Sequence, residues 1–547
     1  MAENKIGSLV NKITTWFKLH KVEGILLVCI LLLSTFLRLY KIGGYMTFLG
    51  DEGRDAIIVR RFLTDFDLML IGPGTSIGNM YLGPLYYYMM APALFVARFS
   101  PVGPAVMIAL LGIFTNYLVW YITKKWFPVG KSDKNRSVNI GALIAAFFYA
   151  IAPTVIIYSK SSWNPNIMPF FSIVAVFSIW KVWKAREYKW LMITGFSLAG
   201  VVQSHYLGLI LFPVIALLWI LTFVAVKIPT TKDSKQKLRT FMIASFCGAG
   251  IFTLLMSPLV IFDARHNWIN FSAMKIFFTE RQTTLSVKPW SSFSKLLPIS
   301  NEISSHVVTG YNDNLGLWFV ILCAVIFMLI ILKIIRSKQI ASTLFAKNEK
   351  YLHSEAFFVL FLWFVFALIG LGVYKQEIYD HYFGFLYPAL FIMLGGISQF
   401  VFALRKKIIT LSFIIFLVLI ANANIVKNPL KYSPNDQLKR SEEVSQRIVD
   451  EAADKPFNIA VIAERNYEGA YQYYLERKQA NFKIINAQKL QETVTDQLFV
   501  VCELPKEKCD PTHNGKAEVA NFGWSKIEKE IDIFGITLYK LVHSNGI

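Results

Sequence analysis

The chain has 547 residues, of which 55% are hydrophobic and only 17% are charged. A soluble protein of this length would need a more polar surface, so the composition excludes an ordinary soluble globular protein. The formal net charge of +20 does not indicate nucleic-acid binding, because the basic residues lie in short loops between apolar runs. Such loops are typical of the cytoplasmic side of membrane proteins.

The first long apolar run, residues 24–40, follows a polar and basic stretch at residues 1–23. No small-x-small cleavage site follows it, so the pattern predicts a signal anchor with a cytoplasmic N-terminus. Ten further runs have roughly the 17–25 residues that span a bilayer. They are 103–122, 139–158, 167–183, 190–206, 207–226, 240–262, 314–335, 355–374, 382–403 and 408–426.

Five basic loops orient these runs, and placing all five in the cytoplasm produces no conflict after residue 102. The sequence therefore predicts a mainly α-helical, polytopic membrane protein with about 11 spans and at most about 13. Residues 24–427 form its membrane domain. The basic loops are 124–136, 184–189, 227–239, 333–350 and 405–407.

Residues 81–99 form one more short apolar run, which contains Pro84, Pro92 and three consecutive tyrosines. If this run crossed the membrane, the basic loop after residue 123 would lie outside. We therefore expect a helix that lies on the outer face, within a first outer loop at residues 41–102. A long outer loop is expected at residues 263–313.

The polar residues 428–547 predict a small α/β domain outside the membrane. They contain Pro, Asn and Asp turns between short periodic segments. The expected elements are a helix at 437–453, strands at 457–463 and 497–503, and a hairpin at 531–542 around Gly535.

Two cysteines, Cys502 and Cys509, flank a short loop with Pro505 in this domain. A loop of this length can bring two Cα atoms within the roughly 4.4–6.8 Å that a disulfide requires. Outside the cytoplasm the bond can persist, so we predict a disulfide. Two free thiols are the alternative, and a metal site with His513 is weaker because it lacks further soft ligands.

Polar residues gather at the predicted outer ends of the apolar runs, where they are candidates for function. Asp51 and Glu52 form the first set, with Gly50 and Gly53 on either side. A carboxylate can accept the proton of an attacking hydroxyl group, and cations can stabilise the charge on a departing phosphate. The candidates for binding that phosphate are Arg54, Lys160, His205, Arg265, His381 and Tyr382.

Several of these side chains also have a purely structural interpretation. His205 can cap a helix, Arg265 can anchor the end of a span by snorkelling, and Tyr382 can anchor a span at the membrane interface. The sequence has no HExxH, paired CxxC or P-loop motif, so metal-dependent hydrolysis and ATP use have no support. A divalent metal ion stays open as a cofactor, but no ligand motif supports it.

Three motifs occur in order near the N-terminus. Arg38-Leu39-Tyr40 ends the first run, Asp51-Glu52-Gly53-Arg54 follows it, and Pro84-Leu85-Tyr86-Tyr87-Tyr88 opens the short outer run. This order resembles the GT-C superfamily of membrane glycosyltransferases. The most similar members are the protein-O-mannosyltransferase-like and aminoarabinose-transferase-like families 39 and 83. The resemblance covers the membrane domain and is firmest over residues 38–170.

Two positions depart from the family pattern. The family has a Ser-Arg-x-x-Arg-x-Asp-like stretch, whereas this chain has Ser159-Lys160 followed by Asn164 and Asn166. The His or Lys that usually precedes the Pro-Leu motif is absent before Pro84. These departures concern the acceptor site and a second acidic metal ligand; they do not concern Asp51.

The resemblance implies an inverting transfer on the outer face, from a polyprenyl-phosphate-linked sugar to a hydroxyl-bearing protein, lipid or glycan. It implies that Asp51 is the catalytic base and that Glu52 supports the base or the acceptor. Arg54 would orient this pair, and Lys160 and His205 would bind the donor phosphate. The expected partners are the two substrates and the lipid bilayer, without nucleic acid.

Two other classes remain open from the sequence. A secondary transporter or flippase-like protein would also have many spans, but it should show repeated halves and broken helices near the membrane midplane. A scaffold protein with a degenerate site is the other alternative. Fold analogy does not identify the sugar or the acceptor.

Overall fold

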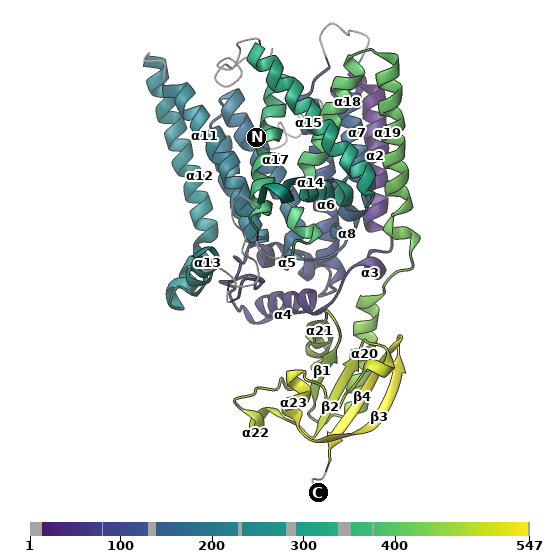
Figure 1. Cartoon of the computed structure of the whole chain (residues 1–547). Helices are drawn as coiled ribbons and strands as arrows, with labels where there is room; N and C mark the ends of the chain where they lie inside the picture. Colours follow the sequence, from purple (N-terminus) through teal and green to yellow (C-terminus); the bar gives the residue numbers. More distant parts are fainter. Residues whose placement is uncertain are drawn as a thin grey trace.

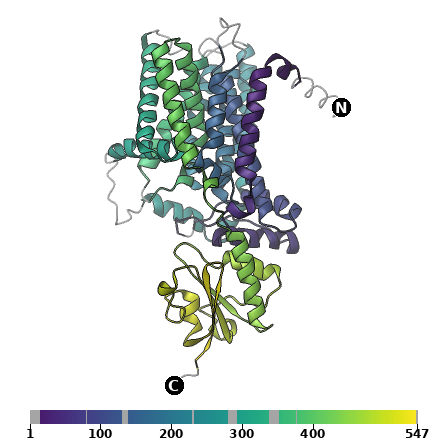
Figure 2. The ribbon, with the colours of Figure 1, turned by 90° about the vertical axis from the view of Figure 1, so that its right-hand side faces the viewer.

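The computed structural model describes residues 14–78, 80–129, 138–227, 232–279, 292–336, 352–374 and 377–544. Long helices run side by side in a bundle, and a small domain that contains the β-sheet lies at one end of it (Figures 1 and 2). The predicted fold class, a polytopic helical protein with a small C-terminal α/β domain, is confirmed.

Eight helical segments are long and apolar enough to cross a membrane. They contain α2 (Lys21–Leu39), α6 (Val102–Trp126), α9 (Met168–Trp180), α11 (Leu211–Lys227), α12 (Lys232–Arg265), α15 (Asp313–Arg336), α17 (Leu352–Gly372) and α19 (Lys407–Val426).

Four apolar helices are shorter. They are α5 (Leu85–Val96), α7 (Ile140–Ile151), α10 (Trp190–Ser204) and α18 (Tyr387–Ala403). The last three lie in predicted spans, whereas α5 lies in the run predicted to stay on the outer face. Each of the eleven predicted spans thus contains one long or one shorter apolar helix.

Helix α7 is interrupted before α8 (Pro153–Tyr158). Arg38, at the end of α2, donates hydrogen bonds to backbone carbonyls at this interruption. Pro153 has no N–H group to bond the carbonyl four residues earlier, which belongs to Tyr149. The Arg38 guanidinium donates to this carbonyl at 3.2 Å and to the carbonyl of Ala150 at 3.2 Å. The geometry of this corner therefore follows from one proline and one buried cation.

The amphipathic helix α4 (Gly50–Asp65) lies across the end of the bundle, between the bundle and the C-terminal domain (Figure 1). It follows the short α3 (Ile42–Tyr45). The side chains of Ala56, Ile57 and Val59 are buried, which fixes one face of α4 against its neighbours. Its N-terminal turn is thereby held at the junction of the two parts of the molecule.

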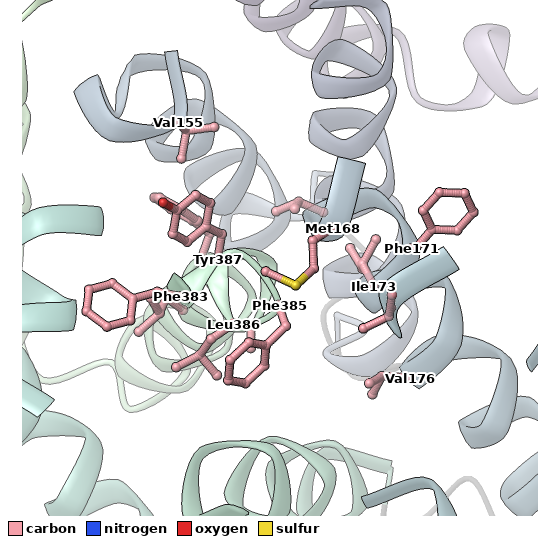
Figure 3. Packing of buried hydrophobic residues seen from close by; sticks show 14 of the residues in the cluster. Val155, Met168, Phe171, Ile173, Val176, Phe383, Phe385, Leu386 and Tyr387 are labelled. Atoms are coloured by element: carbon pink, nitrogen blue, oxygen red, sulfur yellow. The ribbon is translucent and has the colours of Figure 1, made fainter. Parts of the chain in front are cut away.

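The short η6 (Asp380–Phe383) contacts α14 (Ser292–Val307), and α13 (Ile269–Thr279) follows α12 and contacts it. Behind η6, buried side chains from α8, α9 and the start of α18 pack together (Figure 3). Val155, Met168, Phe385 and Tyr387 in this cluster are at most 2% exposed. This packing fixes the backbone that carries His381 and Tyr382.

The C-terminal domain has a four-stranded sheet in the order β1-β2-β4-β3. Strands β1 and β2 are parallel, and the other two pairings are antiparallel. The strands are β1 (Asn458–Ile462), β2 (Gln497–Cys502), β3 (Ser525–Ile533) and β4 (Ile536–His543), and the helices are α20 (Gln437–Ala452), α21 (Gly469–Arg477), α22 (Leu490–Thr493) and α23 (Ala517–Phe522).

Both faces of β2 are buried, and its alternate side chains pack against helices on opposite faces of the sheet. Phe499 and Val501 pack with residues of α20 and α21, whereas Leu498 and Val500 pack with residues of α23. Cys502 ends the strand and is joined to Cys509 by a disulfide, with Cα atoms 6.2 Å apart. The bond ties the loop after β2 to the sheet.

Candidate active site

Asp51 and Glu52 occupy the first turn of α4, where the positive end of the helix dipole favours carboxylates. Glu52 is buried, and its Oε2 accepts the backbone N–H of Leu49 at 3.0 Å. Burial, opposed by that hydrogen bond, raises the pKa of Glu52 to about 7. The Asp51 side chain is 43% exposed, so the two adjacent carboxylates differ sharply in access to solvent.

Arg54 connects the carboxylates of α4. Its Nη1 lies 2.9 Å from Asp51 Oδ1, while its Nε and Nη2 donate to Asp55 Oδ1 at 3.1 and 2.8 Å. Tyr87 of α5 also donates to Asp55 Oδ1, at 2.9 Å. The buried Asp55 carboxylate therefore fixes the Arg54 guanidinium, and Nη1 of Arg54 in turn orients Asp51.

The C-terminal domain completes this arrangement. The Tyr467 hydroxyl donates to Asp51 Oδ1 at 2.8 Å and accepts from Arg54 Nη1 at 3.2 Å. The backbone N–H of Gly50 donates to Asn466 Oδ1 at 2.9 Å. The N-terminal turn of α4 is thus bonded to the loop between β1 and α21.

Asp51 borders two polar pockets. The first encloses about 220 Å³ and contains both Asp51 and Glu52, facing Trp163 from the bundle and Arg465 from the C-terminal domain. We call it the carboxylate pocket. Its complete lining is Thr47, Leu49, Gly50, Asp51, Glu52, Ile157, Tyr158, Ser161, Trp163, Asn166, Arg465 and Tyr467.

The second pocket encloses about 190 Å³ and joins Asp51 and Arg54 to His205, His381 and Tyr382. We call it the histidine pocket. The rings of His205 and Tyr382 lie 4.5 Å apart, as do those of His381 and Tyr382. Burial lowers the pKa of His381 to about 4. This imidazole is therefore neutral at pH 7 without a bound anion.

An apolar pocket of about 330 Å³ adjoins the histidine pocket, because Tyr206 lines both. Most of its lining comes from η3 (Tyr206–Ile210), the end of α17 and the loop before α5. Its wall includes Ile77, Met80, Ile210, Met274 and Val373. A polar head group in the histidine pocket could therefore have its hydrocarbon chain in the apolar pocket.

The structure brings together Asp51, Arg54, His205, His381 and Tyr382 from the predicted set, with Glu52 in the adjoining pocket. Two predicted cations lie elsewhere and line neither polar pocket.

Lys160 is only 2% exposed. Its Nζ donates to the Tyr40 carbonyl at 3.2 Å and lies 4.5 Å from the centre of the Tyr45 ring. Burial, reinforced by nearby Arg38, lowers the pKa of Lys160 to about 8. Arg265 ends α12 and is exposed.

Sequence reasoning missed the residues that the C-terminal domain supplies, Arg465 and Tyr467. They follow β1, which pairs in parallel with β2. Ligands in α/β sheets bind beyond the carboxyl ends of parallel strands. The position of Arg465 and Tyr467 directly after a predicted strand was therefore the signal that could have identified them. It also missed His306 of α14, which lies 2.6 Å from Asp380 Oδ1 and thereby holds η6.

Within the described ranges of the chain, no group of three or more His, Cys, Asp and Glu side chains is arranged to hold a metal ion.

No family model matches this chain, and no curated protein does either. Two solved structures of ArnT from Cupriavidus metallidurans are similar to it, one bound to undecaprenyl phosphate and one in the apo state. In each case the TM-score is 0.54, the sequence identity is 11%, and the alignment covers 94% of this chain and 97% of the other. The fold is therefore shared over nearly the whole length of both proteins.

Proposed function

From the premise that this chain has the GT-C fold, we propose that it transfers a sugar from a polyprenyl-phosphate donor to a hydroxyl group. The observation that carries this proposal is the position of Asp51, which borders both polar pockets. One of these pockets adjoins an apolar pocket. A lipid-linked donor needs that combination of polar and apolar space beside the catalytic group.

The donor head group would occupy the histidine pocket, with its prenyl chain in the apolar pocket. Arg54 and the Tyr382 hydroxyl can donate hydrogen bonds to a phosphate, and a bound anion would favour protonation of His381. The similar ArnT structure that holds undecaprenyl phosphate supports this class of donor.

The acceptor would occupy the carboxylate pocket. Its hydroxyl oxygen attacks the anomeric carbon of the donor while the bond from that carbon to the phosphate oxygen breaks. The hydroxyl proton passes to Asp51, and the polyprenyl phosphate leaves with the electron pair. One such displacement inverts the anomeric centre. Since Arg54 and Tyr467 both bond Oδ1, Oδ2 is the oxygen available for the proton.

The reaction would take place on the extracytoplasmic face. The predicted topology puts the first outer loop and the C-terminal domain on that side, and α4 contacts this domain. A donor in the outer leaflet could then reach Asp51 from the side of the apolar pocket.

The proposal is tested with purified protein, lipid-linked sugars extracted from the host membrane, and mass spectrometry of the products. Asp51→Asn should retain the melting temperature and undecaprenyl-phosphate binding, while transfer falls by about two orders of magnitude or more. The matched control is Asp67→Asn, which changes an exposed aspartate two residues beyond α4 and should leave transfer unchanged.

Transfer at the normal rate by Asp51→Asn would refute Asp51 as the base. Absence of transfer by the wild-type protein, together with movement of the intact donor across vesicles, would instead identify a transporter or flippase-like protein.

A further inference from the structure

The hydrogen bond between Tyr467 and Asp51 joins residues that are 416 positions apart in the sequence. Tyr467 lies in the C-terminal domain, and Asp51 opens α4 at the end of the helical bundle. The hydroxyl group donates to Oδ1, the same oxygen that Arg54 contacts. Two donors on one carboxylate oxygen restrict the rotation of the side chain.

The contact between α4 and α21 holds Tyr467 at a fixed distance from Asp51. A Cβ atom on Gly53 would lie 2.3 Å from the backbone of Ala470, and one on Gly469 would lie 2.2 Å from the Gly50 carbonyl oxygen. The two helices therefore approach each other backbone to backbone. Around this crossing, Phe48 packs edge-on against the rings of Tyr473 and Tyr474.

The loop that carries Tyr467 is itself anchored to the sheet. Asn466 is buried, and its Nδ2 donates to Glu503 Oε1 at 2.7 Å. The Tyr471 hydroxyl donates to the same Glu503 oxygen at 2.6 Å. Glu503 directly follows β2, so the position of Tyr467 is tied to the rigid part of the domain.

We propose that Tyr467 is a positioning residue of the active site, which orients the Asp51 carboxylate for catalysis. The C-terminal domain is then part of the catalytic machinery of the membrane domain. This inference rests on the proposed function, in which Asp51 accepts the proton of the acceptor hydroxyl. Loss of the Tyr467 hydroxyl should loosen the orientation of the base.

Kinetics of Tyr467→Phe provide the first test. We expect an unchanged melting temperature and an unchanged donor KM, together with a roughly tenfold lower kcat. Other groups face Asp51 and remain present in this variant, so they do not produce the difference. They are Glu52, Arg54, His205, His381 and Arg465, each of which lines a pocket together with Asp51.

Tyr473→Phe is the matched control. Tyr473 lies on α21, and its hydroxyl also donates across the domain boundary, to the carbonyl of Phe99. Removing this bond should leave kcat unchanged. The proposal is overturned if Tyr467→Phe keeps the wild-type kcat, or if Tyr473→Phe lowers kcat equally.

A second measurement does not depend on sugar transfer. In a background with Cys29, Cys247 and Cys323 replaced by serine, the rate at which a water-soluble alkylating reagent modifies Asp51→Cys gives the thiol pKa. We expect that pKa to be about one unit higher when Tyr467→Phe is added. Equal thiol values would overturn the positioning role. A wild-type protein without transfer activity would refute only the proposed function. The thiol pKa at position 51 would still differ with and without Tyr467→Phe if Tyr467 donates a hydrogen bond to residue 51.

Discussion

At the scale of single residues, Glu52 combines two opposing tendencies. Its carboxylate caps the N-terminus of α4, but its burial raises its pKa to about 7. The folded protein therefore binds a proton more tightly than the unfolded chain. A carboxyl group with a raised pKa contributes most to stability when protonated, and this contribution is lost as the pH rises from about 4.5 to about 7.

We predict that Glu52→Gln reduces the fall in stability between pH 5 and pH 7. The amide cannot ionise, so it removes about 2 kcal/mol of the change in stability over this pH range. Thermal unfolding in detergent across this pH range checks the prediction. Glu507→Gln, a change in an exposed loop, should keep the wild-type pH dependence. An equal pH dependence in Glu52→Gln would show that Glu52 does not titrate in this range.

Candidate site residues could be predicted from the sequence where their neighbours along the chain form a recognisable pattern. Asp51 was recognisable from its place after the first span, and the histidine pocket contains four more of the predicted residues. Lys160 has the same kind of local context, but its ammonium group bonds the Tyr40 carbonyl instead of lining a pocket. The direction of a side chain depends on packing between distant segments, which local composition does not reveal.

At the scale of elements, the crossing of α4 and α21 depends on glycine. The absence of a side chain lets the two backbones touch, as the 2.2 Å from a Cβ on Gly469 to the Gly50 oxygen shows. Any larger residue must push α21 away from α4. The displacement would also withdraw Tyr467 from Asp51.

We predict that Gly469→Val lowers transfer by about tenfold or more, because a displacement of about 1 Å is enough to disturb a catalytic geometry. The domain should become more sensitive to proteolysis near residue 467. Gly515→Ala is the control, since a Cβ at Gly515 meets no atom within 4 Å. Wild-type transfer by Gly469→Val would mean that the close approach is dispensable.

Most elements of the C-terminal domain could be predicted from apolar runs and turns. The hairpin turns at Phe534 and Gly535, which both have positive φ values, 52° and 70°. Strand β3, however, begins at Ser525 instead of residue 531. Its first residues are mostly charged and exposed, so a search for apolar runs passes over them.

At the scale of the whole molecule, the orientation in the membrane is the main prediction. A cysteine at Ser132, which lies outside the described residues, should resist an impermeant thiol reagent in intact cells, because the predicted topology puts its loop in the cytoplasm. A cysteine at Ala520, exposed on α23, should react. Both tests use a background without Cys29, Cys247 and Cys323. Labelling at residue 132 from outside would require α5 to cross the membrane or a different topology.

The disulfide gives an independent test of the side on which the C-terminal domain lies. Non-reduced, alkylated protein should yield Cys502 and Cys509 in one linked species by mass spectrometry. A loop of this size should contribute about 2–3 kcal/mol to stability. Alkylation of both cysteines would contradict both the bond and an oxidising surrounding for the domain.

The docking of the C-terminal domain on α4 could not be predicted from the sequence. Hydropathy orients spans and apolar periodicity identifies strands, but neither indicates which surfaces meet. The interface depends on glycines, one asparagine and tyrosine hydroxyls, none of which forms a recognisable local pattern.

The distance along the chain between Asp51 and Tyr467 also has a consequence for biogenesis. A ribosome makes the aspartate early and the tyrosine 416 residues later. Throughout that interval the nascent protein carries Asp51 without its hydrogen-bond partner from the C-terminal domain. If Asp51 is the base that we propose, full activity requires that synthesis is almost complete and that the last domain has folded. A truncated chain that stops before residue 467 would then insert its helices and still lack the Tyr467 contact of the proposed active site.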